Sequence, residues 1–259
     1  MPYCIRQKDK KELNNFMKMK KTFIIIRLFS ILLALLSMSS CLFVPAAHKF
    51  ATSTFLKSQS NKIDKSTQII LVMDNSSFFF TRTTLYAMGK LDDNWQRALE
   101  PFNAVIGRNG FAAAGEKREG DGKTPSGIYP LKMTFGYDET VKTKMPYRQT
   151  LADDIWVDDP NADDYNHWVK KQETHAASYE VMKRDDNLYK YGIVIEYNTD
   201  PVIKGNGSAI FLHIWKGEGV PTDGCVAVSE EDIIKILGWL DPAASPLIIM
   251  GTIPFLNQR

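Results

Sequence analysis

Short apolar runs separated by turn residues dominate the chain from residue 68 onward. The first run, Gln68 to Met73, has the length of a buried strand and ends at the polar sequence Asp-Asn-Ser-Ser. Similar runs lie at residues 78–86, 102–106, 128–131, 193–197, 209–215 and 247–250. Because such runs are short and bounded by turn residues, they predict a mainly β domain, a sandwich or barrel with few helices.

One helix is predicted over residues 229–240. Ser229 is a favourable N-cap, and Asp232 follows three residues later, as in a capping box. Apolar side chains then recur with helical spacing on one face, and Pro242 ends the pattern.

The first 47 residues differ in charge from the rest of the chain. They contain eight Lys or Arg and two Asp or Glu, whereas the other 212 residues contain 24 basic and 28 acidic side chains. Three lysines precede an apolar stretch that begins at Phe23, and small residues follow it, as in a secretory signal peptide. We therefore expect an exported protein of the periplasm or cell envelope. An uncleaved anchor reaching Val44 is the alternative, although Arg27 would be costly near its centre.

Two cleavage positions fit this leader. Val44-Pro45-Ala46 has the small residues typical of an ordinary signal-peptidase site. Met38-Ser39-Ser40-Cys41 resembles a bacterial lipoprotein box, in which case a lipid on Cys41 would tether the protein to a membrane. Either cleavage leaves Cys225 as the only free thiol of the exported part.

Two regions are expected after the leader. Residues 48–67 are rich in Ser, Thr, Lys and Gln, which is typical of a flexible linker. Residues 68–253 form the folded domain, with an insertion at about 138–192 in which weak helical spacing from 165 to 183 predicts a helix. The net charge of +2 gives no support to a nucleic-acid binder.

His213 and Cys225 are the candidate reactive residues. In the strand predicted over 209–215, alternation places His213 on the same side as Phe211. Cys225 follows Asp-Gly in the next loop, and Gly224 allows a close backbone approach to a substrate. The order of strand, loop and cysteine is one that can bring a thiol beside an imidazole.

A thiol beside an imidazole loses its proton to the ring and becomes a nucleophile. Backbone N–H groups around Gly224 and Cys225 could then stabilise an oxyanion, so the implied chemistry is acyl transfer through a thioester. However, a lone cysteine in a sheet is more often a small buried hydrophobe, and a lone histidine is often a core residue. The pair alone therefore does not establish catalysis.

A resemblance to a known family supports the catalytic interpretation. Gly207-Ser-Ala-Ile-Phe-Leu-His213 and Pro221-Thr222-Asp223-Gly224-Cys225-Val226 resemble the signature of the L,D-transpeptidase catalytic domain. The segment 122–130, Gly-Lys-Thr-Pro-Ser-Gly-Ile-Tyr-Pro, resembles the Thr-Pro-x-Gly hairpin of that family. The similarity extends over roughly residues 68–252. By this resemblance, Cys225 is the nucleophile, His213 is its general base, and Thr222 and Gly224 shape the nucleophile loop.

The resemblance also implies a fold and an activity. The fold is a β-sandwich-like mixed domain, and the activity is cleavage of the bond before the terminal D-Ala of a peptidoglycan stem tetrapeptide. The acyl group then passes from Cys225 to an amine of another stem. An L,D-carboxypeptidase, which passes it to water, and a non-catalytic cell-wall binding protein are the alternatives.

Two departures from the family pattern affect the expected substrate contacts. The family usually has Arg two residues after the nucleophile, where this chain has Ala227, and a Gly after the histidine, where it has Ile214. We expect Arg148, in the insertion, to supply the missing cation for a substrate carboxylate, although a solvated surface arginine is the simpler interpretation.

We expect no cofactor and no metal ion. His167 and His175 flank Glu173, but their spacing matches no metal-binding motif.

Overall fold

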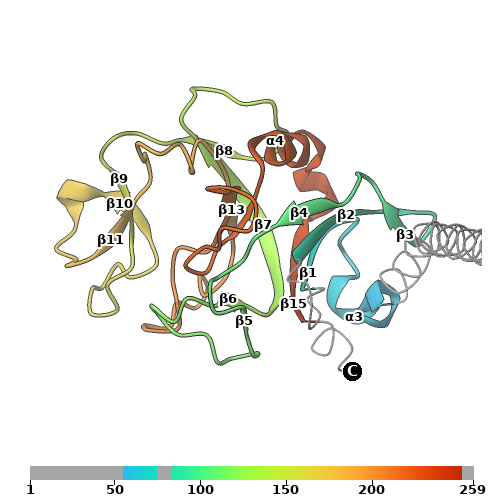
Figure 1. Ribbon diagram of the computed structural model, residues 1–259, viewed down its shortest axis with the longest axis horizontal. Helices are drawn as coiled ribbons and strands as arrows, with labels where there is room; N and C mark the ends of the chain where they lie inside the picture. The colour runs from blue at the N-terminus through green and yellow to red at the C-terminus, as the bar shows by residue number, and fades with distance from the viewer. Residues whose placement is uncertain (1–54, 75–82, 253–259) are drawn as a thin grey trace, which may run out of the picture. The chain divides into compact units, whose positions relative to one another are not determined.

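A ten-stranded mixed sheet is the central element of the computed structural model, which describes residues 55–74 and 83–252 (Figure 1). Its strands follow the order β14-β13-β12-β7-β15-β1-β2-β3, while β4 pairs with β2 and β8 pairs with β7. The strands are β1 (Gln68–Asp74), β2 (Thr83–Leu91), β3 (Asn94–Arg97), β4 (Phe102–Ala104), β7 (Gly127–Gly136), β8 (Tyr147–Gln149), β12 (Tyr191–Ile195), β13 (Phe211–Ile214), β14 (Val226–Val228) and β15 (Leu247–Thr252). The mainly β class predicted from the sequence is confirmed.

Strand β1 explains why the first apolar run of the sequence is uninterrupted. It pairs with β2 on one side and with β15 on the other. Ile70 and Val72 pack into one hydrophobic cluster, and Ile69 and Leu71 pack into another on the opposite face. A strand that is buried on both faces needs apolar side chains at every position, so no polar alternation appears.

The helix α4 (Glu230–Trp239) covers one face of the sheet near β12 and β13. Ser229 caps it as predicted, because its Oγ accepts a hydrogen bond from the Asp232 N–H at 3.1 Å. The helix directs Ile233, Ile236 and Leu237 into the cluster that also contains the side chains of one face of β13.

A separate three-stranded antiparallel sheet forms most of the predicted insertion (Figure 1). It consists of β9 (Asp154–Val157) between β10 (Trp168–Lys170) and β11 (Tyr179–Val181), with the 3-10 helix η1 (Lys171–Glu173) between the two outer strands. The helical spacing predicted for residues 165–183 is therefore largely wrong, because Trp156 and Trp168 are drawn into a shared aromatic cluster by strand pairing.

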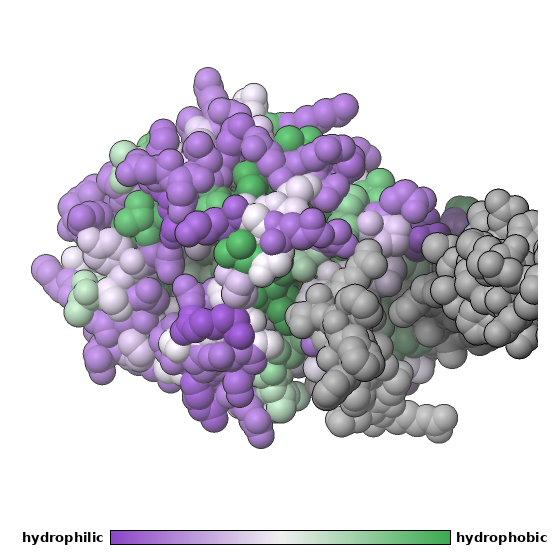
Figure 2. Space-filling view, viewed as in Figure 1, coloured by the Kyte–Doolittle hydropathy of each residue, from purple (hydrophilic) through white to green (hydrophobic). Residues whose placement is uncertain are grey.

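A pair of short strands and a 3-10 helix complete the elements described after residue 68. A two-stranded parallel pair joins β5 (Phe111–Ala112) to β6 (Thr124–Pro125), and the 3-10 helix η2 (Pro242–Ala244) follows α4. On the face that Figure 2 shows, hydrophilic side chains cover most of the described surface. Most apolar side chains of the described residues lie in the buried hydrophobic clusters.

Residues 55–67 differ from the flexible linker that their composition predicts. They contain the helix α3 (Ser60–Ile63), and Leu56 and Ile63 are buried against Ile69 and Trp95. Two apolar anchors suffice to fix a segment that is otherwise polar, because each removes a large side chain from water. The domain therefore begins about a dozen residues before the predicted boundary.

The predicted leader, including Cys41, lies outside the described residues, as does the start of the predicted linker. No helix of the described part of the chain is long and apolar enough to cross a membrane.

The packed position of Leu56 gives a first prediction. Leu56→Ala is expected to lower the free energy of unfolding by about 3 kcal/mol, because it leaves a cavity under the helix. Urea unfolding followed by fluorescence measures this loss. The same truncation at Leu91, which is 59% exposed, is the control and should change little. Equal, small effects of the two truncations would show that residues 55–67 do not pack on the domain.

Candidate active site

The parallel pairing of β13 with β14 brings the two candidate residues to one face of the sheet. Leu212 lies opposite Val226, and His213 lies opposite Ala227. Cys225 directly precedes β14, so continuation of this register puts it level with Phe211, two residues before His213. The predicted alternation is confirmed, because Leu212 and Ile214 pack beneath α4 whereas Phe211 and Cys225 belong to the opposite cluster.

The insertion covers this face with aromatic side chains. Cys225 lies in a cluster with Trp156, Met182 and Tyr189, all of which come from residues 154–190. The Tyr189 ring contacts the His213 ring edge to face, with centroids 5.1 Å apart. Sheet and insertion thus enclose the candidate pair between them.

The thiol of Cys225 is held by backbone groups of the neighbouring strand. Its Sγ accepts from the Phe211 N–H and donates to the Ala209 carbonyl oxygen, both at 3.3 Å. The residue is 8% exposed. Burial raises the pKa of Cys225 to about 12, against the opposing effect of the Phe211 N–H, so the resting sulfur carries its proton.

His213 is also neutral, and its hydrogen bond determines which nitrogen carries the proton. Its Nδ1 lies 2.7 Å from the Ile214 carbonyl oxygen, which can only accept, so Nδ1 is the protonated nitrogen. In this tautomer Nε2 carries the lone pair, and a backbone group of Leu188 also forms a hydrogen bond with the ring. Burial lowers the pKa of His213 to about 4. Within the described residues, thiol and imidazole are not hydrogen-bonded to each other, so proton transfer requires the thiol to leave the Ala209 carbonyl.

Thr222 and Gly224 lie in the loop before Cys225, which the resemblance implies is the nucleophile loop. The Thr222 hydroxyl donates to the Cys225 carbonyl oxygen at 2.6 Å and accepts from the Gly224 N–H at 3.2 Å. Gly224 has a φ of +148°, and a Cβ there would lie 3.1 Å from the Lys123 carbonyl oxygen. A side chain at this position would be strained and crowded, so glycine suits this close approach.

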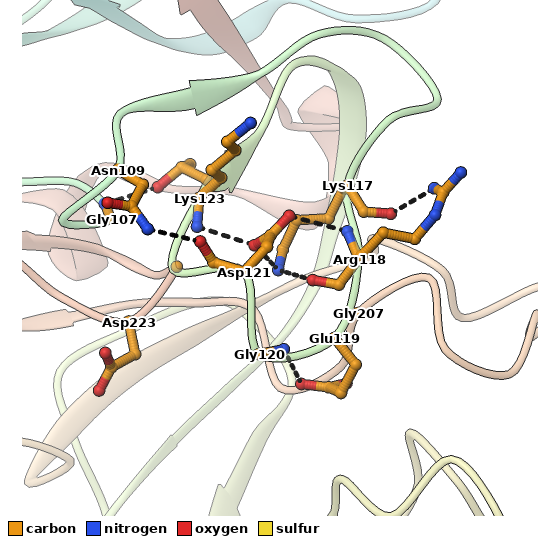
Figure 3. Close-up of polar contacts among 12 residues, drawn as sticks. Gly107, Asn109, Lys117, Arg118, Glu119, Gly120, Asp121, Lys123, Gly207 and Asp223 are labelled. Atoms are coloured by element: carbon orange, nitrogen blue, oxygen red, sulfur yellow. Dashed lines mark hydrogen bonds and ion pairs between the residues drawn. The ribbon is translucent and has the colours of Figure 1, made fainter.

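The loop before the Thr-Pro hairpin contains a buried cation that the sequence reasoning missed. Lys117 is 4% exposed, and its ammonium donates to the Asp121 carboxylate at 2.6 Å and to the Arg118 carbonyl at 2.7 Å (Figure 3). A Cβ on Gly207 would lie 3.3 Å from this ammonium. Its positive charge acts to lower the pKa of Cys225. Lys117 and Asp121 lie four residues apart just before the motif that begins at Gly122, but this spacing alone does not predict that the ammonium is buried.

A second charged group borders Tyr189. Arg184 binds Asp186 through two hydrogen bonds of 2.9 and 2.7 Å and pairs with Glu180 at 3.4 Å. Its guanidinium lies 5.1 Å from the centre of the Tyr189 ring. Burial raises the pKa of Glu180, and the Arg184 charge opposes this effect. The charges of Lys117 and Arg184 both act to lower the pKa of Cys225.

Arg148 lies in the insertion, where it is already paired. Its guanidinium binds the buried Asp154 carboxylate at 3.1 Å and lies 4.1 Å from the centre of the Trp168 ring. Its role toward a substrate carboxylate stays a prediction. Ala227 is fully buried and is bridged to Val105, so an arginine would not fit at this position without rearrangement.

Within the described residues, no group of three or more His, Cys, Asp or Glu side chains could hold a metal ion.

Comparison with known proteins gives one family. The model of the YkuD family, the L,D-transpeptidase catalytic domain, matches residues 62–249. Because this match covers most of the chain, the chain belongs to this family, and its mixed β-sheet carries Cys225 and His213 on one face. Its domain is thus of the L,D-transpeptidase type, whose function concerns peptidoglycan.

One solved structure is similar to the chain. It is titled the helical cell shape determining protein Pgp2 from Campylobacter jejuni, and it shares 16% sequence identity with a TM-score of 0.38. The match covers 73% of this chain and 48% of that one, so the chain spans about half the length of the matched structure. A comparison with curated protein sequences gave no match.

The buried neutral imidazole predicts an acid-dependent stability. The folded-state pKa of His213 lies below its usual 6.5. The free energy of unfolding that depends on the neutral imidazole is therefore complete above about pH 6.5 and is lost as pH falls toward about 4. The loss should reach roughly 3 kcal/mol relative to His213→Gln, which has no such titration. Urea unfolding of both proteins at several pH values measures it. If the free energy of unfolding changed with pH in the same way in both proteins, His213 would not be the buried neutral group that titrates.

Proposed function

We propose that this protein is an exported peptidoglycan L,D-transpeptidase that forms a thioester on Cys225. The observation that carries the proposal is the arrangement of Cys225 and His213 on one buried face, where the Ile214 carbonyl favours the tautomer that has its lone pair on Nε2. Membership of the family supplies the substrate class, the stem peptides of peptidoglycan. Export rests on the leader-like pattern of residues 1–47, and a lipid on Cys41 remains part of this proposal.

In the proposed reaction, His213 Nε2 takes the thiol proton and the sulfur attacks the carbonyl carbon before D-Ala. Backbone N–H groups at the Gly224–Cys225 turn stabilise the oxyanion of the tetrahedral intermediate. The carbon–nitrogen bond breaks, and the leaving D-Ala amine takes the proton from the imidazolium. An amine of a second stem then attacks the thioester, and its proton passes through His213 as the thiol is regenerated.

Burial keeps the resting pair neutral and opposes formation of the ions, an effect that nearby cations partly offset. The resting pair is neutral, so it costs little to bury, and the ions form only when the reaction begins. The charges of Lys117 and Arg184 then favour the thiolate, whereas the Glu180 charge opposes it. Substrate must displace part of the cover formed by the insertion, because both reactive residues are almost fully buried.

A second candidate function is non-catalytic binding of the cell wall. Two observations favour it, namely the thiol bonded to Ala209 rather than to His213, and alanine at position 227. We rank it second because both reactive residues are present on the same face.

The test uses purified disaccharide tetrapeptides, with products identified by mass spectrometry. The protein is expected to release D-Ala and to form cross-linked dimers, and Cys225→Ser is expected to reduce turnover by at least about a thousandfold. The serine variant differs by one atom, so it also serves as the control for wall binding.

The other outcomes separate the alternatives. Release of D-Ala without dimers would identify a carboxypeptidase. Unchanged wall binding by Cys225→Ser, together with no turnover by the parent protein, would identify a binding protein and contradict the proposed transferase.

A further inference from the structure

The Ala209 carbonyl that holds the thiol belongs to a residue with an unusual backbone. Ala209 has a φ of +52°, in the left-handed region that residues with a Cβ seldom adopt. Its carbonyl is the acceptor for the Cys225 thiol at 3.3 Å. The position of this oxygen, and therefore of the sulfur, depends on whatever keeps Ala209 in that conformation.

Asn166, in the turn between β9 and β10 of the insertion, fixes Ala209. Its Oδ1 accepts from the Ala209 N–H at 3.1 Å and from the Trp156 Nε1–H at 2.8 Å. Its Nδ2 donates to the carbonyl oxygens of Tyr197 at 3.3 Å and of Asn198 at 2.6 Å. Asn166 is 3% exposed, and it uses two acceptor and two donor positions.

Tyr165, the residue before Asn166, binds the chain just before Ala209. The Tyr165 hydroxyl accepts from the Gly207 N–H at 3.0 Å and donates to the Glu119 carboxylate. The same carboxylate accepts from the Ser208 hydroxyl at 2.7 Å. Two consecutive residues of the insertion therefore bond Gly207 and Ala209, and Asn166 bonds Ala209, whose carbonyl accepts from the Cys225 thiol.

We propose that Asn166 is a positioning residue for the nucleophile, because it holds Ala209 in the conformation that places the Cys225 thiol. Through this contact the insertion determines where the sulfur lies, in addition to covering it. Its role in turnover rests on the proposed function, whereas its role in placing the thiol does not.

The test is Asn166→Gly. Asn166 itself has a φ of +61°, so glycine removes the side chain without adding backbone strain. The hydrogen bond to the Ala209 carbonyl exists only while the sulfur is protonated, so its loss should make the thiol more acidic. Alkylation of Cys225 by iodoacetamide, followed by intact mass across a pH series, is expected to shift to lower pH by about one unit. With tetrapeptide substrate, kcat should fall about tenfold while KM changes little.

Asn198→Gly is the matched control. Asn198 also has a positive φ, and its side chain makes three hydrogen bonds, to Ile203 and Gly207 but not to Ala209. This variant should lose comparable stability in urea while keeping the alkylation profile of the parent. An equal shift in both variants, or no shift in Asn166→Gly, would overturn the proposal.

A second variant and one further outcome keep the two proposals distinguishable. If Asn166→Gly does not fold, Asn166→Asp replaces it, since the aspartate keeps the oxygen that Ala209 uses. That variant should show no shift of the alkylation profile to lower pH, and such a shift would overturn the proposal. If the parent protein alkylates as expected but turns over no tetrapeptide, the proposed function fails while the positioning role stands.

Discussion

Burial of a neutral thiol and a neutral imidazole on one face of the sheet is the constraint on which the site depends. The parallel register of β13 and β14 puts Cys225 and His213 on that face, and the insertion removes them from water. Burial raises the pKa of Cys225 and lowers that of His213, so neither group is charged at rest. In the proposed reaction, charges form only when the thiol leaves the Ala209 carbonyl for the imidazole.

The sheet serves two structural tasks through its two faces. One face packs under α4 and carries most of the aliphatic core, which fixes the strands in register. The other face is lined by aromatic side chains shared between the sheet and the insertion, and it contains the reactive residues. Strand alternation separates the two faces, because Leu212 and Ile214 pack into the aliphatic core while His213 between them points to the opposite face. The insertion thus borders the candidate site, through Tyr189, whose ring contacts the imidazole, and through Asn166, which accepts a hydrogen bond from the Ala209 N–H.

The sequence predicts those features that depend on local pattern. Alternation in β13 and the cap at Ser229 are both confirmed, because each depends on residues a few positions apart. The extent of the domain was missed, since two apolar side chains in a polar segment give little signal. The insertion strands were missed for a related reason, because their pairing depends on Trp156 and Trp168 meeting across a turn. Lys117 and Asn166 matter through contacts about 90 and 40 residues away in sequence, so no local pattern reports their roles.

The intact mass of the protein after incubation with a carbapenem tests the central claim most directly, because this class of β-lactam acylates thiols. We expect a single covalent adduct that maps to Cys225, that is absent from Cys225→Ser, and that forms more slowly in His213→Gln. A parent protein that gains no mass under conditions where it remains folded would contradict the claim that Cys225 is a nucleophile.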